Sequence, residues 1–263
     1  MIRCGHTPPG PIRARPAWRS LMATAVLRAL VITFASAADS PAPGTPSAAL
    51  LRLQDAVLSA GASDGSSDFG QGNAVEEGKF VVGGSPATIT TLSFAKGKTL
   101  RPDAAGFDAT GAQVWASGLL LQMMLGTEQG LPFVEGRRCI ELGAGTGIVS
   151  VAAARLGATS AVATDGNPVM VALADYNGER NLHHQAQLAA FASATYLWGG
   201  EPLPLGAPFE TVLLTDVLYC KNSEAAGGDC SAEPLLAAVA AVCADTCDVL
   251  LAFERRSATN RLQ

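Results

Sequence analysis

The chain has 263 residues, of which 48% are hydrophobic and 16% charged, and this apolar content excludes wholesale disorder. Its formal net charge of −5 disfavours a nucleic-acid binder that works through a broad basic surface. Five of the 18 basic residues precede residue 39 and no acidic residue does, so the rest of the chain carries 13 basic against 23 acidic residues. The length fits one large domain, or one medium domain with appendages.

Residues 1–38 have the pattern of a targeting leader rather than of a folded element. An arginine-bearing stretch precedes an apolar run from Leu21 to Ala38, which ends in small residues of the kind that signal peptidases accept. The absence of acids and the position of Arg28 inside the run point instead to an organelle transit peptide, and a true start at Met22 or later is a third interpretation. A membrane-spanning helix is disfavoured, because Arg28 near its centre would cost about 2.5–3.5 kcal/mol.

The segment 39–77 is predicted to be a linker with flexible parts. It opens with a Pro/Ser/Ala-rich stretch, and residues 61–77 are rich in Gly, Ser and Asp. A short helix at Leu50–Leu58 fits between these two stretches. Residues 78–263 are expected to form the main folded domain.

Short apolar strands and helices alternate from about Gly111 onward, after two β-branched segments at Phe80–Val82 and Ala87–Phe94. Such alternation implies βαβ units and a parallel sheet with helices on both faces. Ligands bind such sheets at the carboxyl ends of the strands. Asn167 is a predicted helix N-cap. The expected strands are Arg138–Leu142, Ser160–Thr164, Gln187–Ala194, Thr211–Thr215 and Val249–Phe253, and the expected helices are Gln113–Leu125, Gly147–Leu156, Pro168–Leu182 and Pro234–Val242.

The six cysteines and three histidines do not form a metal-binding pattern. Cys243 and Cys247 are spaced CxxxC, and no second pair follows, so no metal is expected. Buried free thiols in a reducing compartment are the favoured interpretation. His183 and His184 are expected to be exposed loop residues.

A glycine-rich turn follows the predicted strand Arg138–Leu142, in the segment Glu141-Leu-Gly-Ala-Gly-Thr-Gly147. Glycine suits a sharp turn that a ligand approaches closely. The dinucleotide fingerprint GxGxxG is not matched, because Ile148 and Ser150 stand at its third position in the two possible registers. Glu141 would repel a pyrophosphate but suits a ligand with a cationic amino-acid end, which indicates S-adenosyl-L-methionine. An ordinary tight turn is the alternative.

The next predicted strand leads into Asp165, which lies 18 residues after Gly147. An acid at this strand end accepts hydrogen bonds from ribose hydroxyls in nucleoside-binding sheets. A helix-capping or loop aspartate is the alternative interpretation. The turn and the acid at this spacing together favour a nucleoside site.

Several motifs between residues 78 and 256 occur in an order that resembles the methyltransferase-21-like group of seven-β-strand, S-adenosylmethionine-dependent protein-lysine methyltransferases. The matching segments are Gly111-x-x-Val114-Trp115, Glu141 to Gly147, Asp165, Asn177 with Asn181, Leu197-Trp198-Gly199, Asp216-x-x-Tyr219 and Glu254-Arg255-Arg256. The resemblance implies a Rossmann-like class I methyltransferase sheet, a protein substrate and a cytoplasmic location. A monomer without stable membrane insertion and without nucleic acid is expected.

The resemblance also implies a role for each site residue. Trp115 and Trp198 would frame the cofactor, with Trp198 beside the adenine, although core packing is an alternative for each. The other cofactor contacts would be Glu141, Gly143, Ala144, Gly145 and Gly147 around the methionine portion, Asp165 at the ribose and Thr215 beside the cofactor.

Asp216 and Tyr219 would face the incoming nucleophile and are the expected catalytic residues. A lysine with a reference pKa of about 10.4 must lose a proton before it attacks. Asp216 would hold the ammonium, and Tyr219 would orient the neutral amine. A strand-end aspartate and a half-buried tyrosine are the structural alternatives.

Two other groups of residues allow two interpretations each. Asn177 and Asn181 share one helix face by their spacing, and either tie the helix to the glycine-rich turn or face water. The cluster Glu254-Arg255-Arg256 either shapes the substrate side or is a solvated group of charges after a strand.

The chain ends at Gln263, without the C-terminal strand hairpin that finishes the family's sheet. Its fifth strand is therefore expected to be an open edge. This departure makes a cofactor-binding or scaffold protein without catalysis an alternative to a protein-lysine methyltransferase. A methyltransferase for histidine or a small molecule is a further alternative, and Ile148 disfavours a nicotinamide oxidoreductase.

Overall fold

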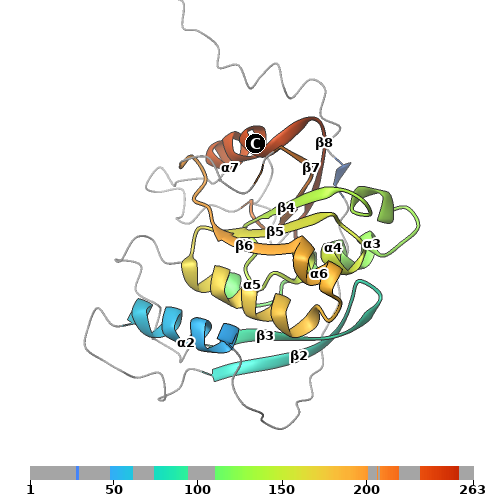
Figure 1. The fold of residues 1–263 in the computed structure, drawn as a ribbon. Helices are drawn as coiled ribbons and strands as arrows, with labels where there is room; N and C mark the ends of the chain where they lie inside the picture. Colours follow the sequence, from blue (N-terminus) through green and yellow to red (C-terminus); the bar gives the residue numbers. More distant parts are fainter. Residues whose placement is uncertain are drawn as a thin grey trace, which may run out of the picture.

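The computed structural model describes residues 28–29, 48–61, 74–93, 110–200, 206, 208–218 and 232–254 (Figure 1). In chain order the strands are β1 (Arg28–Ala29), β2 (Ala74–Val82), β3 (Ser85–Ser93), β4 (Arg138–Leu142), β5 (Ser160–Asp165), β6 (Phe191–Thr195), β7 (Phe209–Thr215) and β8 (Cys243–Ala252). The helices are α2 (Ala48–Gly61), α3 (Ala116–Leu125), α4 (Ile148–Arg155), α5 (Pro168–Asn181), α6 (Gln185–Ala190) and α7 (Ala232–Val242), with 3-10 turns η2 (Thr110–Ala112) and η3 (Leu131–Phe133).

Six of the described strands form one sheet in the order β1-β8-β7-β4-β5-β6, and each neighbouring pair is parallel. From β4 the chain adds β5 and β6 on one side, and then crosses back to add β7 and β8 on the other. The predicted fold class, a parallel α/β sheet, is confirmed. The reversal creates a switch point between β4 and β7, where doubly wound sheets bind ligands.

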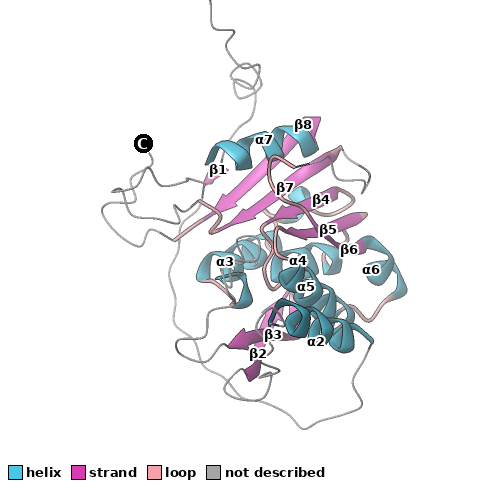
Figure 2. Ribbon diagram, turned by 90° about the vertical axis from the view of Figure 1, so that its left-hand side faces the viewer, coloured by secondary structure: helices cyan, strands magenta, loops and turns pink. Residues whose placement is uncertain are grey.

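The sheet packs on both faces, because successive side chains of a strand point to opposite sides. Cys139 and Leu213 pack on the face covered by α3 and α4, whereas their neighbours Ile140 and Leu214 pack on the face covered by α7. Figure 2 shows α7 on one side of the sheet and α3, α4 and α5 on the other. The apolar runs in β4 and β7 are therefore those of central strands.

The antiparallel pair β2–β3, which we call the hairpin layer, lies against α4 and α5 on the side away from the sheet (Figure 1). Val82 and Ile89 of this hairpin are fully buried in the same cluster as Val149 and Ala152 of α4. The helices α4 and α5 thus lie between two β-structures. The expected strand at Phe80–Val82 lies within β2, which begins earlier than expected. The expected strand at Ala87–Phe94 is present in β3 as far as Ser93, and Phe94 lies outside the described residues.

Part of the expected linker is packed structure. In α2, Ala49 and Leu53 are 0% and 1% exposed and join a buried cluster with Leu173 of α5. Arg52 also forms an ion pair with Asp175 of α5 at 2.8 Å. The short helix expected at Leu50–Leu58 is therefore present as α2, which is longer at both ends and packs on α5. The expectation of a flexible stretch at 61–77 is wrong for residues 74–77, which belong to β2.

Several element boundaries differ from the prediction, most of them by one or two residues, and three differ by more. The segment predicted as the strand Gln187–Ala194 contains α6 and then β6, because Gln, Ala and Leu favour helix, and pairing with β5 starts only at Phe191. The helix expected from Gln113 starts at Ala116, since Trp115 is extended with ψ 151°. The last strand is longer than predicted and begins at Cys243. The predicted N-cap at Asn167 is confirmed by its bond from the Val169 N–H, 2.9 Å.

The outer edge of β8 pairs with β1, through Arg28 opposite Leu250 and Ala29 opposite Leu251. This edge is therefore covered at two positions, which corrects the expectation of a fully open edge. No helix in the described ranges is long and apolar enough to span a membrane.

The described cysteines Cys139, Cys243 and Cys247 carry free thiols. Burial raises the pKa of the Cys139 thiol to about 12, so this group is an inert apolar side chain at neutral pH. His183 and His184 are exposed between α5 and α6, as expected. Within the described segments no cluster of His, Cys, Asp and Glu side chains could hold a metal ion.

Candidate cofactor and active site

The predicted site residues come from the ends of four parallel strands. Gly143 follows β4, Asp165 ends β5, Thr215 ends β7, and Trp198 follows β6 after a short connection. Carboxyl ends of parallel strands meet at one edge of a sheet, so these residues share one edge beside the switch point. Tyr219, Arg255 and Arg256 lie outside the described residues.

Residues 143–147, which we call the cofactor turn, are fixed to β5 by backbone hydrogen bonds. The N–H groups of Gly143 and Ala144 both donate to the carbonyl of Thr164 at 2.8 Å. The Thr164 hydroxyl donates in turn to the carbonyl of Glu141 at 2.7 Å. The turn therefore has one defined shape that joins β4 to α4.

All three glycines of the turn are required by both conformation and space, and Gly147, with φ +74° and an added Cβ 2.8 Å from Ala174 Cβ, is one of them. Gly143 and Gly145 have φ of +76° and +52°, a region that L side chains rarely adopt. A Cβ at Gly143 would lie 2.8 Å from Val217 Cγ1 and 3.4 Å from the Trp198 ring, and a Cβ at Gly145 would lie 2.6 Å from the Gly111 carbonyl oxygen. The turn thus brings Trp198 and η2 into close contact with its backbone.

Asp165 shapes the turn through both carboxylate oxygens. Its Oδ2 accepts the N–H of Gly145 at 3.0 Å, and its Oδ1 accepts the N–H of Asn167 at 2.9 Å. The side chain is half-buried at the end of β5. A carboxylate offers about four acceptor positions, so these bonds are compatible with an additional ribose partner.

Glu141 is buried beneath the turn, with 1% of its surface exposed. Its Oε2 accepts the Ser150 N–H at 2.9 Å and the Ser150 hydroxyl at 2.6 Å, in the first turn of α4. Burial raises the pKa of Glu141 to about 8, against the smaller opposing effect of these two bonds. The carboxyl group therefore fixes the start of α4, a structural role that the sequence interpretation did not include.

The two tryptophans are half-buried. Trp115 Nε1 donates to the carbonyl of Thr110 at 2.9 Å, which holds the ring to η2. Trp198 packs against the buried cluster that contains Leu142 and Val217. Each ring therefore combines a packed part with an accessible part.

Asp216 is the one non-glycine residue with positive φ, +52°, in the described part of the chain. Its Oδ2 accepts the Ser117 hydroxyl at 2.6 Å, and its Oδ1 accepts the N–H of Glu254 at 3.0 Å. Its own N–H donates to the Ala252 carbonyl at 2.9 Å. An uncommon backbone conformation held by three hydrogen bonds is typical of functional sites.

Ser117 was not identified from the sequence. It is 2% exposed in the first turn of α3, two residues after Trp115. Its partner Asp216 is 99 residues away along the chain. No local pattern distinguishes this serine from an ordinary helix residue, so only the folded structure reveals the contact.

Asn177 and Asn181 are 0% and 3% exposed, so the interpretation that they face water is wrong. Asn177 Nδ2 donates to the carbonyl of Thr146 in the cofactor turn at 2.9 Å. This bond confirms the tie between helix and turn for Asn177. Asn181 bonds elsewhere, to Thr88 and to its own helix.

Comparison with known proteins gives a consistent family assignment. A family model described as lysine methyltransferase matches residues 95–262, more than half of the chain. The protein N-lysine methyltransferase METTL21A of Danio rerio is 36% identical over 114 residues, 43% of this chain and 50% of that protein. The protein-lysine methyltransferase METTL21E of Bos taurus is 34% identical over 143 residues, 51% of this chain and 48% of that protein. The chain thus spans about half the length of the curated relatives it matches.

A search of solved structures also finds methyltransferases. One is the T. thermophilus 16S rRNA N2 G1207 methyltransferase in complex with AdoMet and guanosine, with 23% identity, a TM-score of 0.39, and coverage of 57% of this chain and 34% of that chain.

Proposed function

Because the chain belongs to the lysine methyltransferase family, we propose that it transfers a methyl group from S-adenosyl-L-methionine to a lysine side chain of a protein substrate. The single observation that carries this proposal is the convergence at one sheet edge of the cofactor turn, Asp165 and Asp216. The turn and Asp165 suit the cofactor, whereas Asp216 suits a cationic acceptor.

S-adenosyl-L-methionine is the cofactor, and the described residues fit it. Gly143 is half-buried, and the absence of a Cβ there lets the turn pack closely against Val217 and the Trp198 ring. Asp165 has the position of a ribose acceptor. The faces of Trp115 and Trp198 suit a purine or a sulfonium. When bound, the cofactor supplies an electrophilic methyl group on a sulfonium.

The protein must mainly align the acceptor nitrogen with that methyl group, because an in-line displacement depends on geometry more than on acid or base strength. Asp216 would bind the lysine ammonium from the end of β7. Ser117 and the Glu254 N–H hold both of its carboxylate oxygens, so its direction is set before substrate binds. Tyr219 would orient the amine after its proton has left.

Calorimetric titration of the 263-residue chain with S-adenosylhomocysteine, with NAD as a control, tests the cofactor site. We expect binding of the thioether alone, and Asp165→Ala should weaken it at least tenfold. A folded chain that binds neither ligand contradicts the proposal. Retained affinity in Asp165→Ala contradicts only the ribose role.

Transfer is tested with methyl-labelled cofactor and cell lysate, followed by mass spectrometry. We expect label on lysine side chains of a protein. Label on histidine or confined to small metabolites indicates a different acceptor. Binding without any transfer indicates a cofactor-binding protein without catalysis.

For location and assembly we propose a monomer that acts in the cytoplasm. The family resemblance supports the cytoplasm, and residues 1–38 are the part of the chain that could direct it elsewhere. Fluorescent fusions with and without residues 1–38 test the location, and sedimentation of the purified chain tests the monomer.

A further inference from the structure

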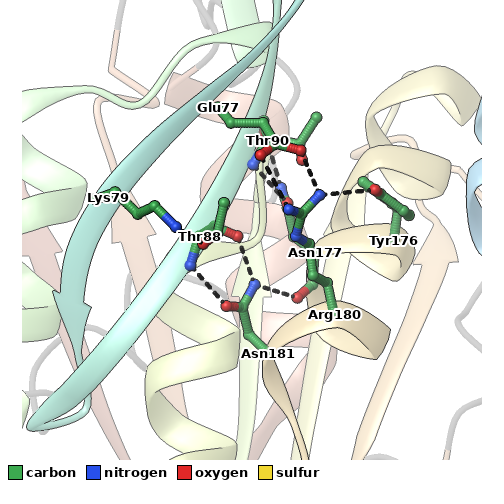
Figure 3. Close-up of polar contacts among 8 residues, drawn as sticks. All are labelled: Glu77, Lys79, Thr88, Thr90, Tyr176, Asn177, Arg180 and Asn181. Atoms are coloured by element: carbon green, nitrogen blue, oxygen red, sulfur yellow. Dashed lines mark hydrogen bonds and ion pairs between the residues drawn. The ribbon is translucent and has the colours of Figure 1, made fainter. Parts of the chain in front are cut away.

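One edge of β3 has no strand beside it within the described residues. Two side-chain amides bond to this edge instead. β3 pairs with β2 on one side. On its other side, Thr88 accepts and donates hydrogen bonds with Asn181 at 2.8 and 2.9 Å, and Thr90 does the same with Asn177 at 3.0 and 2.8 Å. Figure 3 shows both asparagines of α5 reaching the backbone of β3.

The spacing of the two residue pairs explains why this arrangement fits. Four residues of an α-helix advance by about 6 Å. Two residues of a strand advance by about 6.6 Å. Asn177 and Asn181 are therefore separated by nearly the same distance as Thr88 and Thr90. Each amide group takes the place of a peptide group in an adjacent strand.

The two asparagines are alike toward β3 but differ in their remaining hydrogen bond. Asn181 Nδ2 donates to the carbonyl of Asn177 in its own helix at 2.8 Å. Asn177 Nδ2 donates instead to the carbonyl of Thr146 in the cofactor turn at 2.9 Å. Asn177 is fully buried, and both of its N–H hydrogens are used.

The cofactor turn is therefore held at two successive residues from two directions. Asp165 binds the N–H of Gly145, and Asn177 binds the carbonyl of Thr146. Thr146 stands between two glycines with positive φ, which give the backbone many other accessible conformations. The segment that follows η2 is also bonded to β3, because Gln113 Nε2 donates to the carbonyl of Leu92 at 2.8 Å.

We propose that Asn177 is a positioning residue for the cofactor turn, and that through it the docking of the hairpin layer and the binding of S-adenosyl-L-methionine are coupled. This inference rests on the proposed function only in that the cofactor binds at the turn. Coupling between two sites is reciprocal. Cofactor binding should therefore stabilise the hydrogen bonds of β3, and loss of the Asn177 amide should weaken cofactor binding.

Asn177→Ala and Asn181→Ala form a matched pair, because each removes two hydrogen bonds to β3 and only the first removes a bond to the turn. We expect Asn177→Ala to weaken S-adenosylhomocysteine binding at least tenfold, and Asn181→Ala to weaken it less than threefold. Thermal unfolding should show similar losses of stability in both. Equal effects of the two variants on affinity, or wild-type affinity in Asn177→Ala, would overturn the inference.

Hydrogen exchange of the unsubstituted chain provides a test that needs no variant. We expect S-adenosylhomocysteine to slow exchange at the amides of Thr88 and Thr90 as well as in residues 143–147. Protection of the turn with unchanged exchange in β3 would overturn the coupling while the proposed function stands. No binding by the folded chain would overturn both.

Discussion

The sheet and the hairpin layer are held together by different forces. The sheet packs through apolar side chains on both faces, as at Ile140 and Leu213, and its only buried carboxyl in the described residues belongs to Glu141. The hairpin layer shares some of this packing, and side chains of α3, α4 and α5 also bond to its backbone. These include Asn177, Asn181, Arg155 and Gln122.

This difference bears on how each region responds to change. An apolar core tolerates substitutions that conserve its volume, whereas a buried backbone group that loses its only partner costs about 1–3 kcal/mol whatever apolar side chain replaces that partner. Residues that belong to both regions, such as Asn177, therefore have effects at a distance. Four predictions, each with its own substitutions, break or sharpen the comparison.

The largest effect is expected at a glycine of the cofactor turn, and a glycine of the hairpin layer is its control. Gly145→Ala in the cofactor turn should cost about 2–5 kcal/mol, because it combines a left-handed φ with a clash against Gly111. Gly84→Ala in the β2–β3 turn has the same φ class, but nothing lies within 4 Å of the added Cβ. It should cost only about 1–2 kcal/mol. Urea unfolding measures both, and equal losses would contradict the proposed clash.

The next effect is a pH dependence that arises in the sheet. The pKa of Glu141 is about 8 in the folded protein, above its ordinary value of 4.5. Between these two pH values the folded state keeps the Glu141 carboxyl protonated, whereas the unfolded state has lost this proton. The contribution of Glu141 to the free energy of unfolding is therefore complete below pH 4.5 and is lost as pH rises toward 8. We expect a loss of about 2–4 kcal/mol over this range in the cofactor-free protein.

Glu141→Gln is the control for this pH dependence, because an amide oxygen can still accept from Ser150. Urea unfolding at pH 5 and pH 8 should show a much smaller difference in this variant. An unchanged difference would assign the pH dependence to other groups.

A smaller effect is expected at Arg155, which joins α4 to the hairpin layer. Its guanidinium donates to the carbonyls of Val82, Ser85 and Asn181 at 2.7–3.1 Å. Arg155→Ala should cost about 2–3 kcal/mol in urea unfolding, since these bonds involve a charged donor. Arg52→Ala removes the exposed ion pair with Asp175 and should cost less than about 1 kcal/mol.

Lysine at position 155 distinguishes charge from geometry. A point charge on a flexible stem cannot reproduce several fixed bonds, so Arg155→Lys should recover less than half of the loss. Full recovery would show that charge alone attaches the hairpin.

The smallest effect on stability, and a selective one on activity, is expected at Ser117. Ser117→Ala removes the hydroxyl that binds Asp216 Oδ2 at 2.6 Å. We expect methyl transfer to lysate protein to fall about tenfold, or about 1.4 kcal/mol in the barrier, with little change in S-adenosylhomocysteine affinity. A parallel loss of cofactor affinity would show that Ser117 supports the cofactor pocket instead of Asp216.

Much of the fold could be predicted from the sequence because its signals are local. The apolar run Arg138–Leu142 has the bounds of β4, and the glycines after it adopt the positive φ values that only glycine accepts readily. Asn167 and Pro168 start α5 where a capping residue followed by proline predicts it. These features depend on residues within a few positions of one another.

The tertiary structure alone decided which side chains meet. Ser117 reaches Asp216 across 99 positions, and Asn177 reaches Thr90 across 87. It also decided that α6 precedes β6, since only Phe191–Thr195 lies beside β5. Hydrogen bonds between distant residues depend on how helices pack against strands, and a linear pattern of residue types contains no distance between them. The sequence thus determined most elements and the turn, and packing determined which of the alternative contacts hold that turn in place.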